Sequence, residues 1–183
     1  MIYPRLQFLT QFLKYPRTIG SITPSSSFLA KAMVTPVSWE DTEVVVELGA
    51  GTGIFTKYIE QNMKPASRAY IFEKNLPLQK KLKQHYPAFS HYTDAKNMSA
   101  VLCETGEKSA DVIISGLPFT VFPKELTTQI MNEVIKSLKP GGLFITFQYS
   151  LHMKKRLQAD FSTIELRFVP FNIPPAFVYI CRK

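Results

Sequence analysis

Three closely spaced glycines, in Glu47-Leu-Gly-Ala-Gly-Thr-Gly53, constrain the fold of this chain more than any other feature of its sequence. They directly follow the β-branched run Val44-Val-Val-Glu-Leu48 and precede a stretch with apolar residues at helical spacing. Small residues in such a turn let the backbone approach a ligand and leave the first N–H groups of the next helix free. The unit of strand, glycine turn and helix therefore predicts an α/β domain with a ligand site at the end of its first strand.

The chain continues to alternate between strand-like and helix-like segments from residue 42 onward. We predict strands over residues 44–48, 69–73, 91–92, 111–115, 143–149, 164–169 and 176–181. Helices are predicted over residues 55–61, 76–86, 124–138 and 151–161, the third ending at Lys139-Pro-Gly-Gly142. This order predicts a Rossmann-like, seven-stranded, mostly parallel sheet with helices on both faces.

A separate N-terminal piece precedes this domain. Residues 3–14 predict an amphipathic helix with a polar stripe and an apolar face, ended by Tyr15-Pro16. A second helix is expected after Thr23-Pro-Ser-Ser26, where proline and hydroxyl residues suit a helix N-terminus. We therefore divide the chain into a helical cap or membrane-interface segment, residues 1–40, and a ligand-binding domain, residues 41–183. The apolar face either lies on a membrane or covers the domain, and the sequence leaves both open.

Size and composition exclude several classes of protein. A chain of 183 residues suits a single domain, and its longest uncharged apolar stretch, residues 112–123, is too short and too interrupted to span a membrane. The N-terminus lacks the pattern of a secretory signal, so we expect a cytoplasmic protein. Cys103 and Cys181 are far apart and lack neighbouring ligand residues, which predicts no disulfide partner and no metal site.

The formal net charge of +8 favours an anionic partner, either a nucleic acid or an acidic membrane surface. The first acidic residue is Glu40, so the cations Arg5, Lys14 and Arg17 precede every carboxylate. Most of the cations are lysines, which act as point charges rather than planar readers of bases. The excess of lysine over arginine slightly favours a diffuse anionic surface as the partner.

Three carboxylates lie at the ends of predicted strands near the glycine turn. The spacing Gly-x-Gly-x-Gly, with Glu47 just before it, differs from the Gly-x-Gly-x-x-Gly of dinucleotide sites, and a carboxylate there would repel phosphates but attract an ammonium. Glu73, about 20 residues further on, is placed to accept both hydroxyls of a ribose. Asp94 can accept a hydrogen bond from an adenine amine. Ammonium, ribose and adenine, with a sulfonium, make up S-adenosylmethionine.

This constellation resembles the class I S-adenosylmethionine-dependent methyltransferases, and the resemblance runs from Val44 to the C-terminus. It implies S-adenosylmethionine as the cofactor. The residues that it assigns to the cofactor are Glu47, Gly49, Ala50, Gly51, Gly53, Glu73, Lys74, Asp94, Ala95 and Ser115.

The loop after the predicted fourth strand, Ser115-Gly-Leu-Pro-Phe119, indicates the methyl acceptor, because such sheets bind ligands beyond the carboxyl ends of their strands. Adenine amino-methyltransferases, including the ribosomal RNA dimethylases, carry Asn or Asp first in this loop, where this chain has Gly116. The Gly-Leu-Pro sequence, with Phe8-Leu-Thr-Gln-Phe-Leu13 and residues 20–27, is similar to the bacterial phospholipid N-methyltransferases. The resemblance implies methylation of phosphatidylethanolamine toward phosphatidylcholine.

This resemblance and the charge pattern assign further roles. The amine would be aligned by Gly116, Leu117, Pro118, Phe119 and Tyr149, with the Gly116 carbonyl holding its hydrogens and Phe119 facing the methylated cation. Contacts to the headgroup or to an anionic membrane surface are assigned to Arg5, Phe8, Phe12, Lys14, Arg17, Ser25, Ser26 and His152. Packing, capping and solvation explain Tyr149, His152, Ser25 and Ser26 equally well. Two alternatives stay open: an RNA adenine N6-methyltransferase and a non-catalytic S-adenosylmethionine-binding module.

Overall fold

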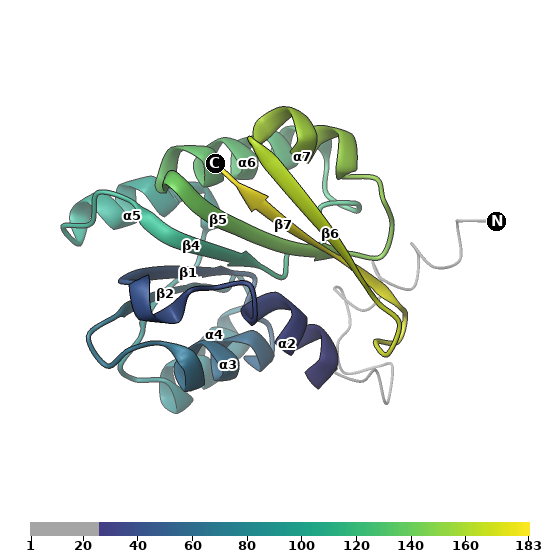
Figure 1. Ribbon diagram of the computed structural model, residues 1–183. Helices are drawn as coiled ribbons and strands as arrows, with labels where there is room; N and C mark the ends of the chain where they lie inside the picture. The colour runs from purple at the N-terminus through teal and green to yellow at the C-terminus, as the bar shows by residue number, and fades with distance from the viewer. Residues whose placement is uncertain (1–25) are drawn as a thin grey trace.

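A seven-stranded sheet forms the centre of the computed structural model, which describes residues 26–183 (Figure 1). Its strands are β1 (Val44–Leu48), β2 (Arg68–Phe72), β3 (Ser90–Tyr92), β4 (Ala110–Ser115), β5 (Leu138–Gln148), β6 (Thr163–Val169) and β7 (Ala176–Arg182). They lie in the order β3-β2-β1-β4-β5-β7-β6, and β7 runs antiparallel to the other six strands. The predicted seven-stranded, mostly parallel sheet is confirmed.

Helices cover both faces of this sheet, as predicted (Figure 1). One face carries α2 (Ser27–Val34), α3 (Ile54–Asn62) and α4 (Leu76–His85), and the other carries α5 (Met98–Glu104), α6 (Lys124–Ser137) and α7 (Lys154–Asp160). Two short 3-10 turns, η1 (Trp39–Asp41) and η2 (Ala95–Asn97), complete the elements. Within residues 26–183, no helix has the length and apolar character needed to cross a membrane.

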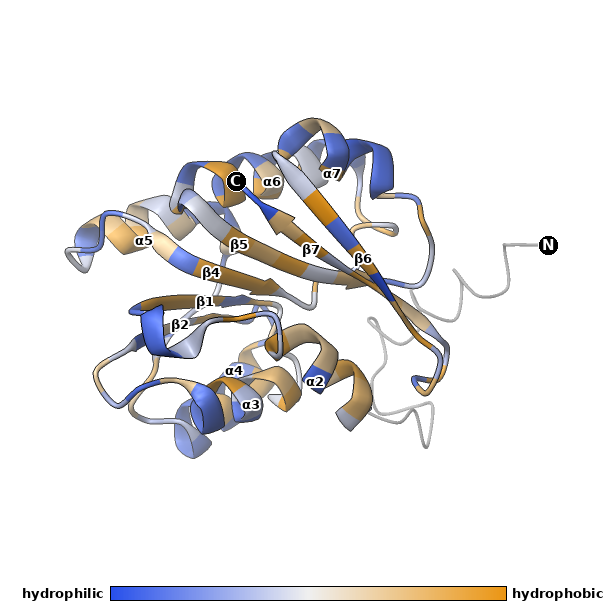
Figure 2. Cartoon of the chain, in the orientation of Figure 1, coloured by the Kyte–Doolittle hydropathy of each residue, from blue (hydrophilic) through white to orange (hydrophobic). Residues whose placement is uncertain are grey.

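The central strands are apolar because both of their faces are covered (Figure 2). In β1, Val44, Val46 and Leu48 pack toward α5, α6 and α7, whereas Val45 packs toward α2 and α3. Glu47 shares the face of Val45 and is completely buried. A carboxylate in such a position is costly unless it has a partner, so Glu47 marks a functional place in an otherwise apolar strand.

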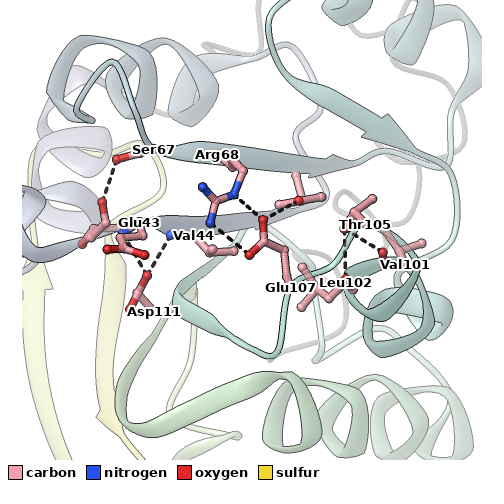
Figure 3. A network of polar contacts seen from close by, with 11 residues as sticks. Glu43, Val44, Ser67, Arg68, Val101, Leu102, Thr105, Glu107 and Asp111 are labelled. Atoms are coloured by element: carbon pink, nitrogen blue, oxygen red, sulfur yellow. Dashed lines mark hydrogen bonds and ion pairs between the residues drawn. The ribbon is translucent and has the colours of Figure 1, made fainter.

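Polar side chains tie the amino ends of the strands together (Figure 3). Asp111 at the start of β4 accepts hydrogen bonds from the backbone N–H groups of Val44 (2.7 Å) and Glu43 (2.9 Å) and pairs with Lys139. Arg68 at the start of β2 pairs with Glu107, which also accepts a hydrogen bond from the Tyr70 hydroxyl (3.0 Å). This edge of the sheet is therefore held together by bonds within the chain.

The expected helix after Ser26 is present as α2, and Ser26 caps it by accepting a hydrogen bond from the Leu29 backbone N–H (3.2 Å). Leu29, Ala30 and Met33 are fully buried against the sheet, so α2 contributes to the core. The helix predicted over residues 3–14 falls outside the described residues. So do the membrane and headgroup assignments of Arg5, Phe8, Phe12, Lys14, Arg17 and Ser25.

Two local predictions are wrong. The helix α5 was not predicted, and β5 begins at Leu138, five residues earlier than predicted, so Lys139-Pro-Gly-Gly142 lies inside a strand. The helix α6 does end just before this segment, at Ser137, but Leu138 pairs with Ala110 across an irregularity in the β4–β5 register, and this tertiary contact starts the strand earlier than the local sequence indicates.

Candidate active site

The carboxyl ends of β1, β2 and β4 bring three loops together at one edge of the sheet. The Gly49 N–H donates to the Phe72 carbonyl (2.8 Å), which joins the glycine turn to the end of β2. The Gly116 N–H donates to the Leu48 carbonyl (2.8 Å), which joins the loop after β4 to the end of β1. The structure thus brings the predicted glycine turn, Glu73 and the predicted acceptor loop side by side.

The glycine turn leaves space for a ligand at Gly51. This residue has a φ of +57°, in the left-handed region. Apart from Gly51 and its two chain neighbours, no heavy atom of the described residues lies within 4 Å of the place where a Cβ would stand. At Gly49, by contrast, the space is occupied by the Leu117 side chain, which would lie 2.6 Å from an added Cβ. The backbone of the turn is therefore open at its middle and packed against the acceptor loop at its start.

Glu73 organises the glycine turn. Its side chain is buried and accepts hydrogen bonds from the Gly51 N–H (2.7 Å) and the Asn75 N–H (2.7 Å), one on each carboxylate oxygen. Each oxygen keeps a second lone pair, so these bonds leave room for ligand hydroxyls. The residue predicted to bind a ribose therefore also fixes the loop beside it.

Glu47 is the titratable residue of the site with the most unusual surroundings. One carboxylate oxygen accepts a hydrogen bond from the Thr56 hydroxyl (2.6 Å), while the other, Oε1, has no partner in residues 26–183. Burial raises the pKa of Glu47 from its ordinary 4.5 to about 8; the Thr56 hydrogen bond opposes this rise, and the nearby Glu73 adds to it. A buried acceptor without a donor fits a positively charged group of a ligand.

The remaining predicted cofactor residues lie further along the same edge. Asp94 caps η2 by accepting a hydrogen bond from the Lys96 N–H (3.0 Å) and pairs with the Lys96 ammonium at 3.4 Å. Ala95 is half-buried against the core, and Lys74 is exposed. Asp94 therefore has a structural role whether or not it meets an adenine.

The acceptor loop has no room for a side chain at its first position. A Cβ on Gly116 would stand 2.8 Å from the Gly49 carbonyl oxygen, closer than real Cβ contacts come. The buried Ser115 hydroxyl accepts a hydrogen bond from the Leu117 N–H (3.2 Å) and shapes the turn. The Asn or Asp of adenine amino-methyltransferases therefore cannot replace Gly116 without moving one of the two loops.

Sequence reasoning missed Gln148, which holds this loop from the end of β5. Its side chain is buried, and Nε2 donates a hydrogen bond to the Leu117 carbonyl (3.1 Å). The only signal in the sequence is an amide in a strand of otherwise apolar residues. Gln148 fixes the acceptor loop against β5, the neighbour of β4.

Three predicted acceptor contacts differ in their surroundings. Phe119 is buried and packs edge-on against Phe122, with ring centroids 6.1 Å apart, which favours a packing role over contact with a product. Tyr149 is half-buried; burial raises its pKa, although a hydrogen bond with Asn172 acts in the opposite direction. His152 is exposed to solvent.

A second residue missed from the sequence, Asn172, lies in the turn between β6 and β7. Its Oδ1 accepts a hydrogen bond from the Ser26 N–H (2.9 Å), and its Nδ2 donates to the Pro174 carbonyl (2.7 Å). These bonds join the start of α2 to the β6–β7 turn. Ser26 is thus engaged in capping and in this link.

Comparisons with known proteins agree with this geometry. Residues 45–142 match the family model described as a methyltransferase domain. The ornithine lipid N-methyltransferase of Singulisphaera acidiphila is 33% identical over 180 residues, which cover 96% of this chain and 94% of the relative.

Among solved structures, the 1,6-didemethyltoxoflavin-N1-methyltransferase of Burkholderia thailandensis, with bound S-adenosylhomocysteine, superposes with a TM-score of 0.71 at 15% identity. The matched part covers 99% of this chain and 88% of that one. An rRNA methylase from Streptococcus thermophilus superposes with a TM-score of 0.58 at 18% identity, covering 85% and 92%. The chain belongs to the methyltransferase domain family and is a class I S-adenosylmethionine-dependent methyltransferase.

Proposed function

We propose that this enzyme transfers methyl groups to the amine of a membrane lipid headgroup. The observation that carries the proposal is the acceptor loop, in which Gly116 lies against the Gly49 backbone and leaves no room for an acceptor-binding side chain. Support comes from the relative of nearly equal length that is named for ornithine lipid N-methylation.

The donor site would be formed by the glycine turn and two carboxylates. S-adenosylmethionine supplies, when bound, a methyl group on a sulfonium. Glu47 Oε1 would accept a hydrogen bond from the ammonium of its amino-acid part, and Glu73 would accept from the ribose hydroxyls. Gly51 leaves the space that the ligand needs beside the turn. The unpartnered oxygen of Glu47, the open turn at Gly51 and the buried carboxylate of Glu73 all fit S-adenosylmethionine.

The acceptor loop would align a neutral amine. A primary amine is mostly protonated near neutral pH, and burial beside a cation lowers its pKa and frees the lone pair. The Gly116 carbonyl would accept the hydrogens of the amine, while Gln148 holds the next carbonyl, that of Leu117, in place. Positioning of this kind accounts for much of the rate of a direct displacement.

Two lipids carry a suitable primary amine. Phosphatidylethanolamine is the acceptor that the sequence resemblance implies, and ornithine lipid is the one that the name of the relative favours. Both lie in a membrane leaflet, so the enzyme would work in the cytoplasm as a peripheral protein at the inner membrane surface. A nucleobase acceptor is disfavoured by the missing side chain at Gly116.

The test is methyl transfer from radiolabelled S-adenosylmethionine by the full chain to four acceptors offered separately. These are vesicles with phosphatidylethanolamine, vesicles with ornithine lipid, unmodified ribosomal RNA and a total metabolite extract. We expect label in one or both lipids. Label in RNA alone, or in a soluble metabolite alone, contradicts the proposal, and donor binding without transfer to any acceptor indicates a binding module.

A further inference from the structure

Three large apolar side chains are exposed together at one corner of the molecule. Phe28 at the start of α2 is 57% exposed, and Phe171 and Ile173 in the β6–β7 turn are 71% and 81% exposed. The rings of Phe28 and Phe171 are in contact, with centroids 5.4 Å apart, and Figure 2 shows α2 and this turn at the same corner. We call these three residues the apolar tip. An exposed apolar cluster of this kind is typical of an interaction site.

The exposure of the tip is fixed by the fold. Asn172, between Phe171 and Ile173, is buried and bonded at both ends of its amide, to the Ser26 N–H and the Pro174 carbonyl. With this side chain held inward, its two neighbours are directed outward. The turn therefore holds two apolar side chains mostly exposed, although the Phe171 ring contacts the Phe28 ring.

The tip lies at the same edge of the sheet as the active site. β5 and β6 both run antiparallel to β7, so they are parallel to each other. The carboxyl end of β6, where the turn begins, therefore lies at the edge that carries the glycine turn and the acceptor loop. In Figure 1 this edge is on the right-hand side, and the turn is at its lower end.

Charge around the tip suits an anionic surface. Neither α2 nor residues 170–175 contain a carboxylate. On α2, Lys31 is exposed and lies three residues after Phe28, so the two side chains share one side of the helix. Lys154 and Lys155 at the start of α7 are also exposed, but they lie on the opposite face of the sheet from α2. Apolar side chains that enter the headgroup region, flanked by lysines that remain at its surface, are the usual basis of peripheral membrane binding.

We propose that the apolar tip enters the headgroup region of an anionic phospholipid bilayer and so turns the acceptor loop toward the leaflet. The inference rests on the proposed lipid acceptor and gives it a route to the enzyme. The apolar side chains of the tip make the contact with the bilayer, and the exposed lysines strengthen binding as the anionic lipid content rises. The β6–β7 turn would then be a membrane contact in addition to any made by residues 1–25.

Binding of the full chain to vesicles of phosphatidylglycerol and phosphatidylcholine in equal parts tests the proposal. The double variant F171S/I173S should bind at least about tenfold more weakly in a flotation assay, because it removes most of the inserted apolar area. F171L/I173L, which stays apolar, should bind like the parent. So should L76S, which alters a side chain that is 63% exposed at the start of α4, four residues after β2, a strand far from β6 in the sheet order. Unchanged binding of F171S/I173S, with an unchanged unfolding temperature, overturns the proposal.

A second measurement distinguishes the bilayer from a segment of the chain itself. In F171W, vesicles with brominated acyl chains should quench the fluorescence of the introduced indole well beyond that of the parent, whose one tryptophan is Trp39. If residues 1–25 cover the tip instead, the introduced indole emits as a shielded group without vesicles and brominated lipid does not quench it. That outcome also overturns the proposal.

Failure of the docking surface and failure of the proposed function give different results. On monomeric short-chain phosphatidylethanolamine, or its ornithine lipid counterpart, F171S/I173S should turn over like the parent, and on vesicles it should be slower. Equal turnover on vesicles contradicts the docking role. If the parent methylates no lipid in either form, the proposed acceptor is wrong, and the flotation and quenching results still decide whether the tip binds a bilayer.

Discussion

The two edges of the central sheet differ in how their charged groups are satisfied. At the amino edge, Arg68 pairs with Glu107, and Asp111 accepts hydrogen bonds from the backbone N–H groups of Glu43 and Val44 (Figure 3). Asp111 also pairs with Lys139. At the carboxyl edge, Glu47 has an oxygen without a partner in the described part of the chain. The difference indicates that one edge is built to hold the sheet together and the other to hold a ligand.

The pKa values of the two edges shift in opposite directions. For Asp111, burial alone would raise the pKa, but hydrogen bonds from Lys139, Val44 and Glu43 outweigh it and lower the pKa below its usual 3.8. For Glu47, burial prevails and the pKa rises to about 8. A carboxylate with a lowered pKa stabilises the fold near neutral pH, whereas one with a raised pKa weakens it.

The largest expected difference between the edges is in enzymatic activity, when one glycine at each edge is replaced by alanine. In G116A the new Cβ meets the Gly49 carbonyl at 2.8 Å, and in G142A it meets the Asp111 carbonyl at 2.9 Å. Each change should lower the free energy of unfolding by about 1–3 kcal/mol. Only G116A displaces the acceptor loop, so methyl transfer per folded molecule should fall on the order of 100-fold. Equal activity losses in the two variants would remove the distinction between the edges.

Removing the charge of Asp111 should destabilise the chain and leave the reaction intact. D111N loses charge-assisted hydrogen bonds to the backbone of β1, so urea denaturation at pH 7 should show a loss of about 1.5–3 kcal/mol. D160N, which breaks the helical surface pair with Arg156, should cost only about 0.5 kcal/mol. Cofactor affinity should be the same in both variants, and a selective loss in D111N contradicts the structural role of the amino edge.

The raised pKa of Glu47 predicts the pH dependence of stability. Between pH 4.5 and about 8 the folded chain keeps a proton that the unfolded chain has released, so the free energy of unfolding contributed by this residue falls as pH rises. E47Q removes this dependence and should be relatively more stable toward pH 8. Denaturation curves of the parent and E47Q at several pH values measure it; parallel curves would show that Glu47 titrates normally.

The smallest effect is expected at Gln148. Replacing it by methionine removes the hydrogen bond to the Leu117 carbonyl, worth about 1 kcal/mol, so kcat/KM for the acceptor should fall about fivefold. The Kd for S-adenosylhomocysteine should not change, because Gln148 bonds to the acceptor loop and not to the glycine turn. The exposed Gln158, changed in the same way, serves as the control. A lower cofactor affinity in Q148M contradicts a role confined to the acceptor.

The sequence predicts the sheet well because its signals are local. The β-branched runs, the glycine turn and the carboxylates at the ends of β1 and β2 are each visible within a few residues. The helix α5 was missed because its apolar residues, Met98, Val101 and Leu102, span little more than one turn.

No local pattern in the sequence shows which residues Gln148 and Asn172 bond to. Gln148 acts through Leu117, 31 residues away, and Asn172 through Ser26, 146 residues away, so their roles depend on the folded topology. For the same reason the sequence could show that Gly116 lacks a side chain but not that the Gly49 backbone leaves no room for one.

Calorimetric titration of S-adenosylhomocysteine into the full chain tests the division between the two edges most directly. We expect one binding site per chain in the parent and in D111N, with equal affinity. In E73A, which loses the carboxylate beside Gly51, affinity should fall at least about tenfold, since a hydrogen bond to a charged group contributes about 1.5–3 kcal/mol. Equal affinities in E73A and D111N, or no binding to the parent chain, would contradict the assignment of the carboxyl edge to the methyl donor.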